Sequence, residues 1–294
     1  MRTIVLFITM ITCFLYAFDV IFTPLESVEQ ILSVVESAEE SVYVTSYSVD
    51  HPEVIQLLDY LASRGVDVRA IIETPFAAGN IKMKIDAEKS LFHMKTIILD
   101  DHTAILSSAN FTVHSLKESY NDLIIVSSKK FASQLKQFFL EMWAGRDFSL
   151  NAEAEGLRAF THDIENEVLN RISQAKKSVC IAMYALTHPE LWAILKILNC
   201  RGVNVRVVTD KWFLANSPIA QIPSESFEVR VVKSRTLHSK LIIVDGECVI
   251  TGSANATKSG YNSNAELAVV ITDEAVVSEY ISYFEHLFKE GESF

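Results

Sequence analysis

Residues 41–73 read SVYVTSYSVDHPEVIQLLDYLASRGVDVRAIIE, and residues 178–210 read SVCIAMYALTHPELWAILKILNCRGVNVRVVTD. The two stretches align without a gap, and 13 of the 33 aligned positions are identical. A repeat of this length means that one folding unit occurs twice in the chain. The chain has 294 residues, of which 49% are hydrophobic, so each unit is large enough to bury a core.

Each copy has the pattern of a strand, a helix and a second strand. The first seven residues are largely apolar and are typical of a buried strand. Apolar residues then recur at helical spacing after Pro52 and Pro189, and proline suits the first turn of a helix. We expect His51 and His188, which precede these prolines, to serve local geometry. A strand, a helix and a strand joined in this way form a parallel crossover.

Further elements complete each half. An amphipathic helix is expected just before each copy, and three strand-like runs with a closing helix are expected after it. We therefore predict an α/β fold of two similar α/β/α layered halves, related by a pseudo-two-fold axis, with the active site at their interface. The polar stretch 144–156 marks the boundary, so we divide the chain into residues 1–18, 19–150 and 151–294.

A polar signature follows each copy at the same internal spacing. The first signature contains His93, Lys95, Asp100, Ser108 and Asn110. The second signature contains His238, Lys240, Asp245, Ser253 and Asn255. An acidic residue comes after each signature, Asp122 in the first half and Glu266 in the second.

These signatures resemble the motif of the phospholipase D superfamily, which is HxK, four residues, D, six residues and GSxN, present twice in an active unit. The resemblance covers nearly all of residues 19–294 and implies a phospholipase D-like fold and a phosphodiesterase activity. Two departures lie in the first half. Ser107 replaces the usual Gly, and Asp122 stands one residue further along than Glu266.

The residue types suit the cleavage of a phosphodiester. Neutral imidazole is nucleophilic near pH 7 and can form a covalent phosphoryl intermediate, and a protonated imidazole can assist the leaving alkoxide. Residues i and i+2 of a strand point to the same face, so His93 and Lys95 project together, as do His238 and Lys240. Two lysines with Asn110 and Asn255 can then surround the phosphoryl oxygens.

The resemblance also implies roles for individual residues. The N-terminal histidine of the family is usually the nucleophile, which implies His93 as nucleophile and His238 as general acid, with the reverse assignment as the alternative. Glu266 and Asp122 are expected to hold imidazole N–H groups and thereby to set the tautomers. The remaining signature residues are expected to support the pocket (Ser108 and Ser253) or to act as structural anchors on the opposite face (Asp100 and Asp245).

No spacing typical of a metal site occurs, so we expect a metal-independent reaction that needs no cofactor. The first 18 residues contain one charge, Arg2, and an apolar run of about 15 residues, which is short for a membrane span and typical of a signal peptide. We therefore expect export, with the segment either cleaved or retained as an anchor. Because both halves lie in one chain, we expect a monomer.

The substrate remains open between two classes. The net charge is −11, which argues against a large polynucleotide footprint. A phospholipase D acting on phospholipid at a membrane surface is our first hypothesis, with apolar mouth residues Trp212 and Phe213. An endonuclease acting on single-stranded or duplex nucleic acid is the alternative, and a cardiolipin synthase-like phosphatidyl transferase is a variant of the first. Cations near the mouth suit either anion, and they are Lys82, Lys84, Lys89, Lys211, Lys233 and Arg235.

Overall fold

The computed structural model describes residues 18–77, 79–86, 89–217 and 227–293. The first half contains the helices α1 (Glu29–Glu36), α2 (Pro52–Ser63) and α3 (Lys129–Trp143) and a π-helical turn, η1 (His114–Glu118). Its strands are β1 (Phe18–Thr23), β2 (Ser41–Ser46), β3 (Asp67–Ile72), β4 (Lys82–Ile85), β5 (Thr96–Leu99), β6 (Thr103–Ser107) and β7 (Ser119–Ser127).

The second half repeats these elements with additions at its ends. Its helices are α4 (Ile164–Ser173), α5 (Pro189–Cys200), α6 (Lys211–Asn216), α7 (Lys258–Asn262) and α8 (Glu274–Glu290). Its strands are β8 (Asn151–Ala154), β9 (Leu157–Phe160), β10 (Ser178–Met183), β11 (Asn204–Asp210), β12 (Glu228–Val232), β13 (Thr236–Leu237), β14 (Lys240–Val244), β15 (Cys248–Gly252), β16 (Ala268–Ile271) and β17 (Glu292–Ser293).

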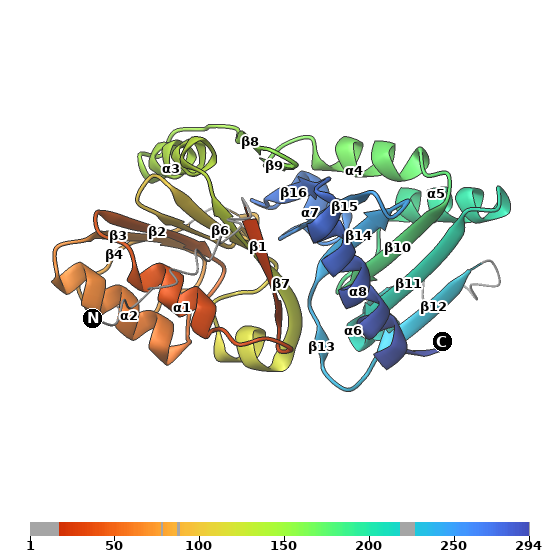
Figure 1. Cartoon of the computed structure of the whole chain (residues 1–294), viewed down its shortest axis with the longest axis horizontal. Helices are drawn as coiled ribbons and strands as arrows, with labels where there is room; N and C mark the ends of the chain where they lie inside the picture. Colours follow the sequence, from red (N-terminus) through yellow and green to blue (C-terminus); the bar gives the residue numbers. More distant parts are fainter. Residues whose placement is uncertain (1–17, 78, 87–88, 218–226, 294) are drawn as a thin grey trace, which may run out of the picture.

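Each half is built on one mixed sheet (Figure 1). The first sheet has the order β1-β7-β6-β5-β2-β3-β4, and the second has the order β17-β12-β11-β10-β14-β15-β16-β9-β8. The run from β4 to β1 matches the run from β12 to β9 strand for strand, so the duplication continues through the whole sheet. The predicted α/β fold of two similar halves is confirmed.

Some strands were missed by sequence analysis. The segments 74–92 and 211–237 contain β4 and β12, which were not among the predicted strands and which extend each crossover by one parallel strand. Phe18, which sequence analysis placed in the leader, begins β1, and β1 pairs antiparallel with β7. The predicted leader otherwise lies outside the described residues. Among those described, no helix is long and apolar enough to cross a membrane.

Three apolar clusters hold the layers together. One lies between the first sheet and α1 and α2, and a second lies between the second sheet and α4 and α5. The third draws residues from both sheets, from α3 and from α8, so it is a central core shared by the two halves. Because both halves contribute buried apolar residues to this core, they pack together as one unit. We call the interface between the two halves the seam.

Short backbone pairings cross the seam in a symmetric way. Leu237 of β13 pairs with Tyr120 of β7, and Phe92 forms a parallel bridge with Ala265. The offset from His93 to His238 is 145 residues, and the same offset relates Phe92 to Leu237 and Tyr120 to Ala265. The residue before each signature histidine is therefore anchored to the opposite half.

Candidate active site

The two signature histidines lie at the seam, and each is held by the other half. The backbone N–H of His93 donates to the carbonyl of Ala265 at 2.9 Å, and that of His238 donates to the carbonyl of Tyr120 at 2.9 Å. Each histidine shortly precedes the first strand of its signature, β5 or β14. Lys240 begins β14, whereas Lys95 stands directly before β5. The segment that leads into each strand therefore brings an imidazole to the interface.

His93 is paired with a carboxylate across the seam. Its Nδ1 lies 2.9 and 3.0 Å from the two carboxylate oxygens of Glu266, which is buried. Ser253 Oγ donates to the same carboxylate at 2.5 Å, and Asn264 Nδ2 donates at 3.2 Å. A carboxylate accepts only, so Nδ1 of His93 carries the proton and Nε2 keeps its lone pair.

His238 is paired with an amide instead of a carboxylate. Its Nδ1 lies 2.9 Å from Oδ1 of Asn121, whose own Nδ2 donates to the carbonyl of Ser115 at 2.9 Å. Ser108 Oγ lies 3.2 Å from the same amide oxygen. The acceptor again places the proton on Nδ1, but without a formal negative charge.

The role expected of Asp122 was wrong. Its carboxylate accepts from Ser108 at 2.8 Å, from Thr251 at 2.6 Å and from Tyr280 at 2.8 Å, and it holds no imidazole. Burial raises the pKa of Asp122, and the hydrogen bonds from the three hydroxyl groups oppose this rise by stabilising the charged carboxylate. It ties the first half to β15 and α8.

Counting along the chain would have found the correct partner. Asn121 follows Asn110 by the same 11 residues by which Glu266 follows Asn255. The equivalence was overlooked because an acid was expected, and the nearest acid lies one residue further along. On a strand, a shift of one residue turns a side chain to the opposite face.

The two signature lysines are buried beside the histidines. The Nζ atom of Lys95 donates to the carbonyl of His93, and that of Lys240 donates to the carbonyl of His238. Burial lowers the pKa of Lys95 to about 7. Burial, and next the charge of Lys95, lower the pKa of Lys240 well below its usual value.

Burial and the neighbouring lysine charges also lower the pKa of both imidazoles. Burial, followed by the charge of Lys95, lowers the pKa of His93 to about 4. Burial and then the charges of Lys240 and Lys95 lower the pKa of His238 well below its usual value. Cationic groups from both halves thus repel one another across the seam. An anion placed among them would relieve that repulsion, so the site is poised to bind negative charge.

Two amides complete the polar set. Asn110 and Asn255 each have a buried side-chain oxygen that lacks a hydrogen-bond partner among the described residues. A buried polar atom without a partner costs free energy unless a ligand or water satisfies it. Both amides stand directly after the strands β6 and β15, at the end of the sheet where the histidines lie.

Asp100 and Asp245 lie away from this set and hold backbone. Asp100 accepts the N–H groups of residues 39–41 at 2.8–3.2 Å, and Asp245 accepts those of residues 176–178 at 2.6–3.0 Å. Both aspartates have a left-handed φ, 54° and 57°, at the turn after their strand. Each carboxylate therefore fastens this turn to the start of the neighbouring strand.

Aromatic rings flank the histidines unequally. The ring of Tyr47 lies 6.2 Å from His93, and that of Tyr184 lies 5.2 Å from His238 and 5.6 Å from Trp212. Phe213, which was expected at the mouth, is 1% exposed and stacks on Trp192 in the second core, because it lies on the inner side of α6.

Two of the cations that were expected near the mouth form ion pairs with acidic side chains. Lys82 pairs with Asp67 and Lys233 pairs with Glu292. Within the described residues, no cluster of three or more His, Cys, Asp or Glu side chains is arranged to hold a metal ion.

A family described as cardiolipin synthase, PLD-like domain, matches residues 31–143 and 168–288, one match in each half. The chain belongs to this phospholipase D-like family. Among solved structures, phosphatidylserine synthase from Haemophilus influenzae superposes with a TM-score of 0.74 at 15% identity, covering 95% of this chain and 87% of that chain. A polyphosphate kinase from Porphyromonas gingivalis gives 0.72 at 15%, covering 91% and 46%. At this identity the two structures show the shared fold alone.

Curated relatives match less than half of the chain. The mitochondrial cardiolipin hydrolase of Xenopus laevis is 34% identical over 128 residues, which are 42% of this chain and 61% of the relative. A phospholipase D of Rickettsia conorii is 29% identical over 117 residues, which are 39% of this chain and 58% of that protein. The matched stretch thus spans about three-fifths of each relative's length.

Proposed function

We propose that this protein is a metal-independent phosphodiesterase that hydrolyses the head-group ester of phospholipids through a phosphohistidine. The observation that carries the proposal is the pair of imidazoles at the seam, each oriented through Nδ1 by the opposite half and flanked by a buried lysine. This arrangement presents two Nε2 atoms to one anion site. Such a pair can supply a nucleophile on one side of a phosphorus atom and an acid on the other.

In the first step, Nε2 of His93 attacks phosphorus and forms a P–N bond. The P–O bond to the head group breaks, and His238 gives its proton to the departing oxygen. In the second step, His238 takes a proton from water, whose oxygen attacks phosphorus, and the P–N bond breaks. Lys95, Lys240 and the two signature amides are placed to hold the phosphoryl oxygens as negative charge builds on them.

The unequal partners support the assignment of His93 as nucleophile. A ring phosphorylated at Nε2 that keeps its Nδ1 proton carries positive charge, which the Glu266 carboxylate can neutralise. Asn121 offers His238 no such charge, so a protonated His238 is a stronger acid and gives up its proton more readily. Binding of the anionic substrate offsets the lysine charges and raises the pKa of His238 towards the range in which it holds a proton.

Phospholipid is favoured over nucleic acid as the substrate. A net charge of −11 is a poor match to a polynucleotide, whose affinity comes from many basic contacts that release counterions. One buried phosphate site is enough for a lipid head group. The curated relatives are named cardiolipin hydrolase and phospholipase D, which supports the same choice.

The test is a parallel assay of purified protein on vesicles of phosphatidylcholine and phosphatidylethanolamine and on single-stranded DNA. We expect phosphatidic acid and free head group, transfer to added short alcohols, and turnover within about two-fold in excess EDTA because the mechanism needs no metal. Salt-sensitive cleavage of DNA without phosphatidic acid would reassign the protein to the nucleases. Loss of turnover in EDTA, restored by a divalent ion, would overturn the metal-free step.

We further propose that the protein is exported and acts as a monomer. One chain carries both halves of the site, so no second copy is needed to complete it. Cell fractionation and light scattering test these two points, and cytoplasmic protein or a stable dimer would contradict them.

A further inference from the structure

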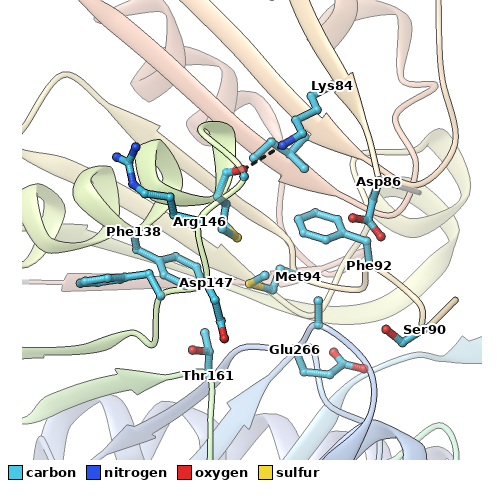
Figure 2. A pocket seen from close by; sticks show the side chains of 15 residues that line it. Lys84, Asp86, Ser90, Phe92, Met94, Phe138, Arg146, Asp147, Thr161 and Glu266 are labelled. Carbon is cyan, nitrogen blue, oxygen red and sulfur yellow. Dashed lines mark hydrogen bonds between the residues drawn. The ribbon is translucent and has the colours of Figure 1, made fainter. Parts of the chain in front are cut away.

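A cavity of about 530 Å³ opens beside the catalytic seam (Figure 2). Its floor is apolar and is formed by Ile71, Phe92, Met94 and Phe138, which are all buried members of the central core. The residues 146–148 also line it and are exposed, so they mark its mouth. A cavity of this size is within the usual range for a small-molecule site.

The cavity shares a wall with the proposed phosphate site. Phe92 and Met94, which line the cavity, are the two neighbours of His93 in the chain. Glu266, which binds Nδ1 of His93, lines it as well, and Figure 2 shows this side chain at the cavity wall. A molecule whose phosphate lies at His93 could therefore place another part of itself in this cavity.

The equivalent position in the other half is filled. The offset of 145 residues relates Phe138 to Tyr283, and the strand registers relate Thr161 to Phe22. The rings of Phe22 and Tyr283 stack at 4.3 Å, and the Tyr283 hydroxyl lies 2.8 Å from Ser239 Oγ. Where the first half supplies the ring of Phe22, the second half supplies only Thr161, and the cavity remains open.

The chain beyond each closing helix adds to the difference. After α8 the chain forms β17, which pairs with β12 and covers that edge. After α3 the chain turns away through residues 145–148 towards β8, and no strand among the described residues pairs with the outer edge of β4. The opening therefore follows from the way the chain leaves α3.

The two cationic groups at the cavity have partners of their own, and the carboxylates of Asp86 and Asp147 also line it. The Lys84 ammonium donates to the carbonyls of Met142 at 3.1 Å and Trp143 at 3.4 Å, and Arg146 pairs with Glu141. Two large apolar side chains are exposed to solvent at the lining segments, namely Leu91 at 45% and Phe148 at 41%. Phe148 lines the cavity, and Leu91 lies between the lining residues Ser90 and Phe92. Exposed apolar residues beside one opening indicate an apolar partner.

We infer that this cavity receives an acyl chain of the lipid whose phosphate lies between the two histidines, with Leu91 and Phe148 resting on the lipid surface. The inference rests on the proposed function and adds to it a site for the apolar part of the substrate. The apolar floor takes the chain, while the charged mouth stays in water. Removing an acyl chain from water is favourable in proportion to the apolar area buried.

The variant Thr161→Phe tests this directly, because it places in the cavity the ring that closes the other half. Thr161→Ser is the matched control. We expect Thr161→Phe to lower kcat/KM at least about ten-fold on long-chain phosphatidylcholine in mixed micelles. Its turnover of bis-p-nitrophenyl phosphate and of short-chain dibutyryl phosphatidylcholine should stay within about two-fold. An equal loss on all three substrates, or no loss on the long-chain lipid, would overturn the inference.

A binding measurement separates this inference from the proposed function. A dansylated fatty acid should bind the wild-type protein and gain fluorescence, and Thr161→Phe should abolish that binding while Thr161→Ser retains it. The exposed rim variant Phe148→Ser should weaken binding without endangering the fold. Probe binding that neither variant changes would refute the acyl site even in an active phospholipase. Probe binding lost in Thr161→Phe would support it even if phospholipid hydrolysis were absent.

Discussion

The two halves share one sheet order but differ at the positions that border the site. The imidazole of the first half meets the carboxylate of Glu266, whereas that of the second half meets the amide of Asn121. Thr161 leaves a cavity open where Phe22 closes its counterpart. The duplication thus keeps the residues that would bind phosphate in both copies and varies the residues that surround them. A symmetric scaffold can in this way carry two imidazoles with different roles.

The departure at Ser107 has a local explanation. Gly252 has a φ of 120°, and an added Cβ there would lie 2.2 Å from the carbonyl oxygen of Leu267. Ser107 has no such φ, and its hydroxyl accepts the N–H of Ala109 at 2.8 Å. The backbone of the first half takes a different path at this point, so a side chain is tolerated there and excluded in the second half.

The largest expected effect comes from removing either imidazole. His93→Ala and His238→Ala should each lower kcat by at least about a thousand-fold on phospholipid, and the double variant should lose little more, because the residues act as a unit. A p-nitrophenyl leaving group needs no proton, so His238→Ala should still release a burst of about one equivalent of p-nitrophenol from such a diester, while its turnover stays low because the second step lacks its base. His93→Ala should show no burst. A burst in His93→Ala instead would reverse the assignment of nucleophile and acid.

The next effect concerns the partners of the imidazoles. Glu266→Gln removes the charge that would stabilise the phosphohistidine, and a charged hydrogen bond of about 1.5–3 kcal/mol corresponds to a loss in kcat of about 10–100-fold. Asn121→Asp should instead raise the pKa of His238 and shift the pH–rate profile to higher pH. Rapid-quench trapping of the phosphoenzyme with both variants is the measurement. Unchanged trapping in Glu266→Gln would show that the carboxylate only orients the ring.

A third prediction compares two N-terminal truncations, one that keeps the edge strand β1 and one that removes it. Deleting residues 1–17 should leave a folded, active protein, since β1 begins at Phe18. Deleting residues 1–23 removes β1 with Phe22, exposes the edge of β7 and should lower the melting temperature by several degrees or prevent soluble expression. Thermal unfolding of the two truncations decides the point, and equal stability would mean that β1 contributes nothing to the core.

The smallest expected effect is a pH dependence of the folding stability. It comes from the two equivalent histidines that precede α2 and α5, namely His51 and His188. His188 Nε2 lies 2.6 Å from Glu165, whereas both ring nitrogens of the buried His51 lack a partner among the described residues. Burial lowers the pKa of His51. A histidine whose pKa is lower when folded contributes stability that is complete above the unfolded pKa of about 6.5 and is lost as the pH falls below it.

The copies 41–73 and 178–210 are related by an offset of 137 residues, and the same offset relates Val28 to Glu165. Val28→Glu should therefore give His51 a carboxylate and reduce this loss. His51→Phe should also flatten the acid side of the stability curve. Urea unfolding at pH 7 and pH 5 measures both. A wild-type protein as stable at pH 5 as at pH 7 would show that His51 does not protonate in this range or that other groups compensate.

The sequence by itself determined the duplication, the strand-helix-strand core of each half and the spacing of the two signatures. Those features follow from local periodicity and from a repeated pattern of residues, both of which are readable along one chain. The catalytic candidates followed as well, because the two repeated signatures resemble a known family motif. Their expected placement on a strand did not hold, since His93 and Lys95 both precede β5.

Other features depend on residues far apart in the chain, and only the tertiary structure decided them. The pairing of His238 with Asn121 instead of Asp122 depends on which face of β7 meets the seam, and a single-residue shift reverses that face. The burial of Phe213 depends on how α6 packs on Trp192. The open cavity beside His93 depends on Thr161 meeting Phe138 across the two halves, because packing joins residues that no local pattern relates.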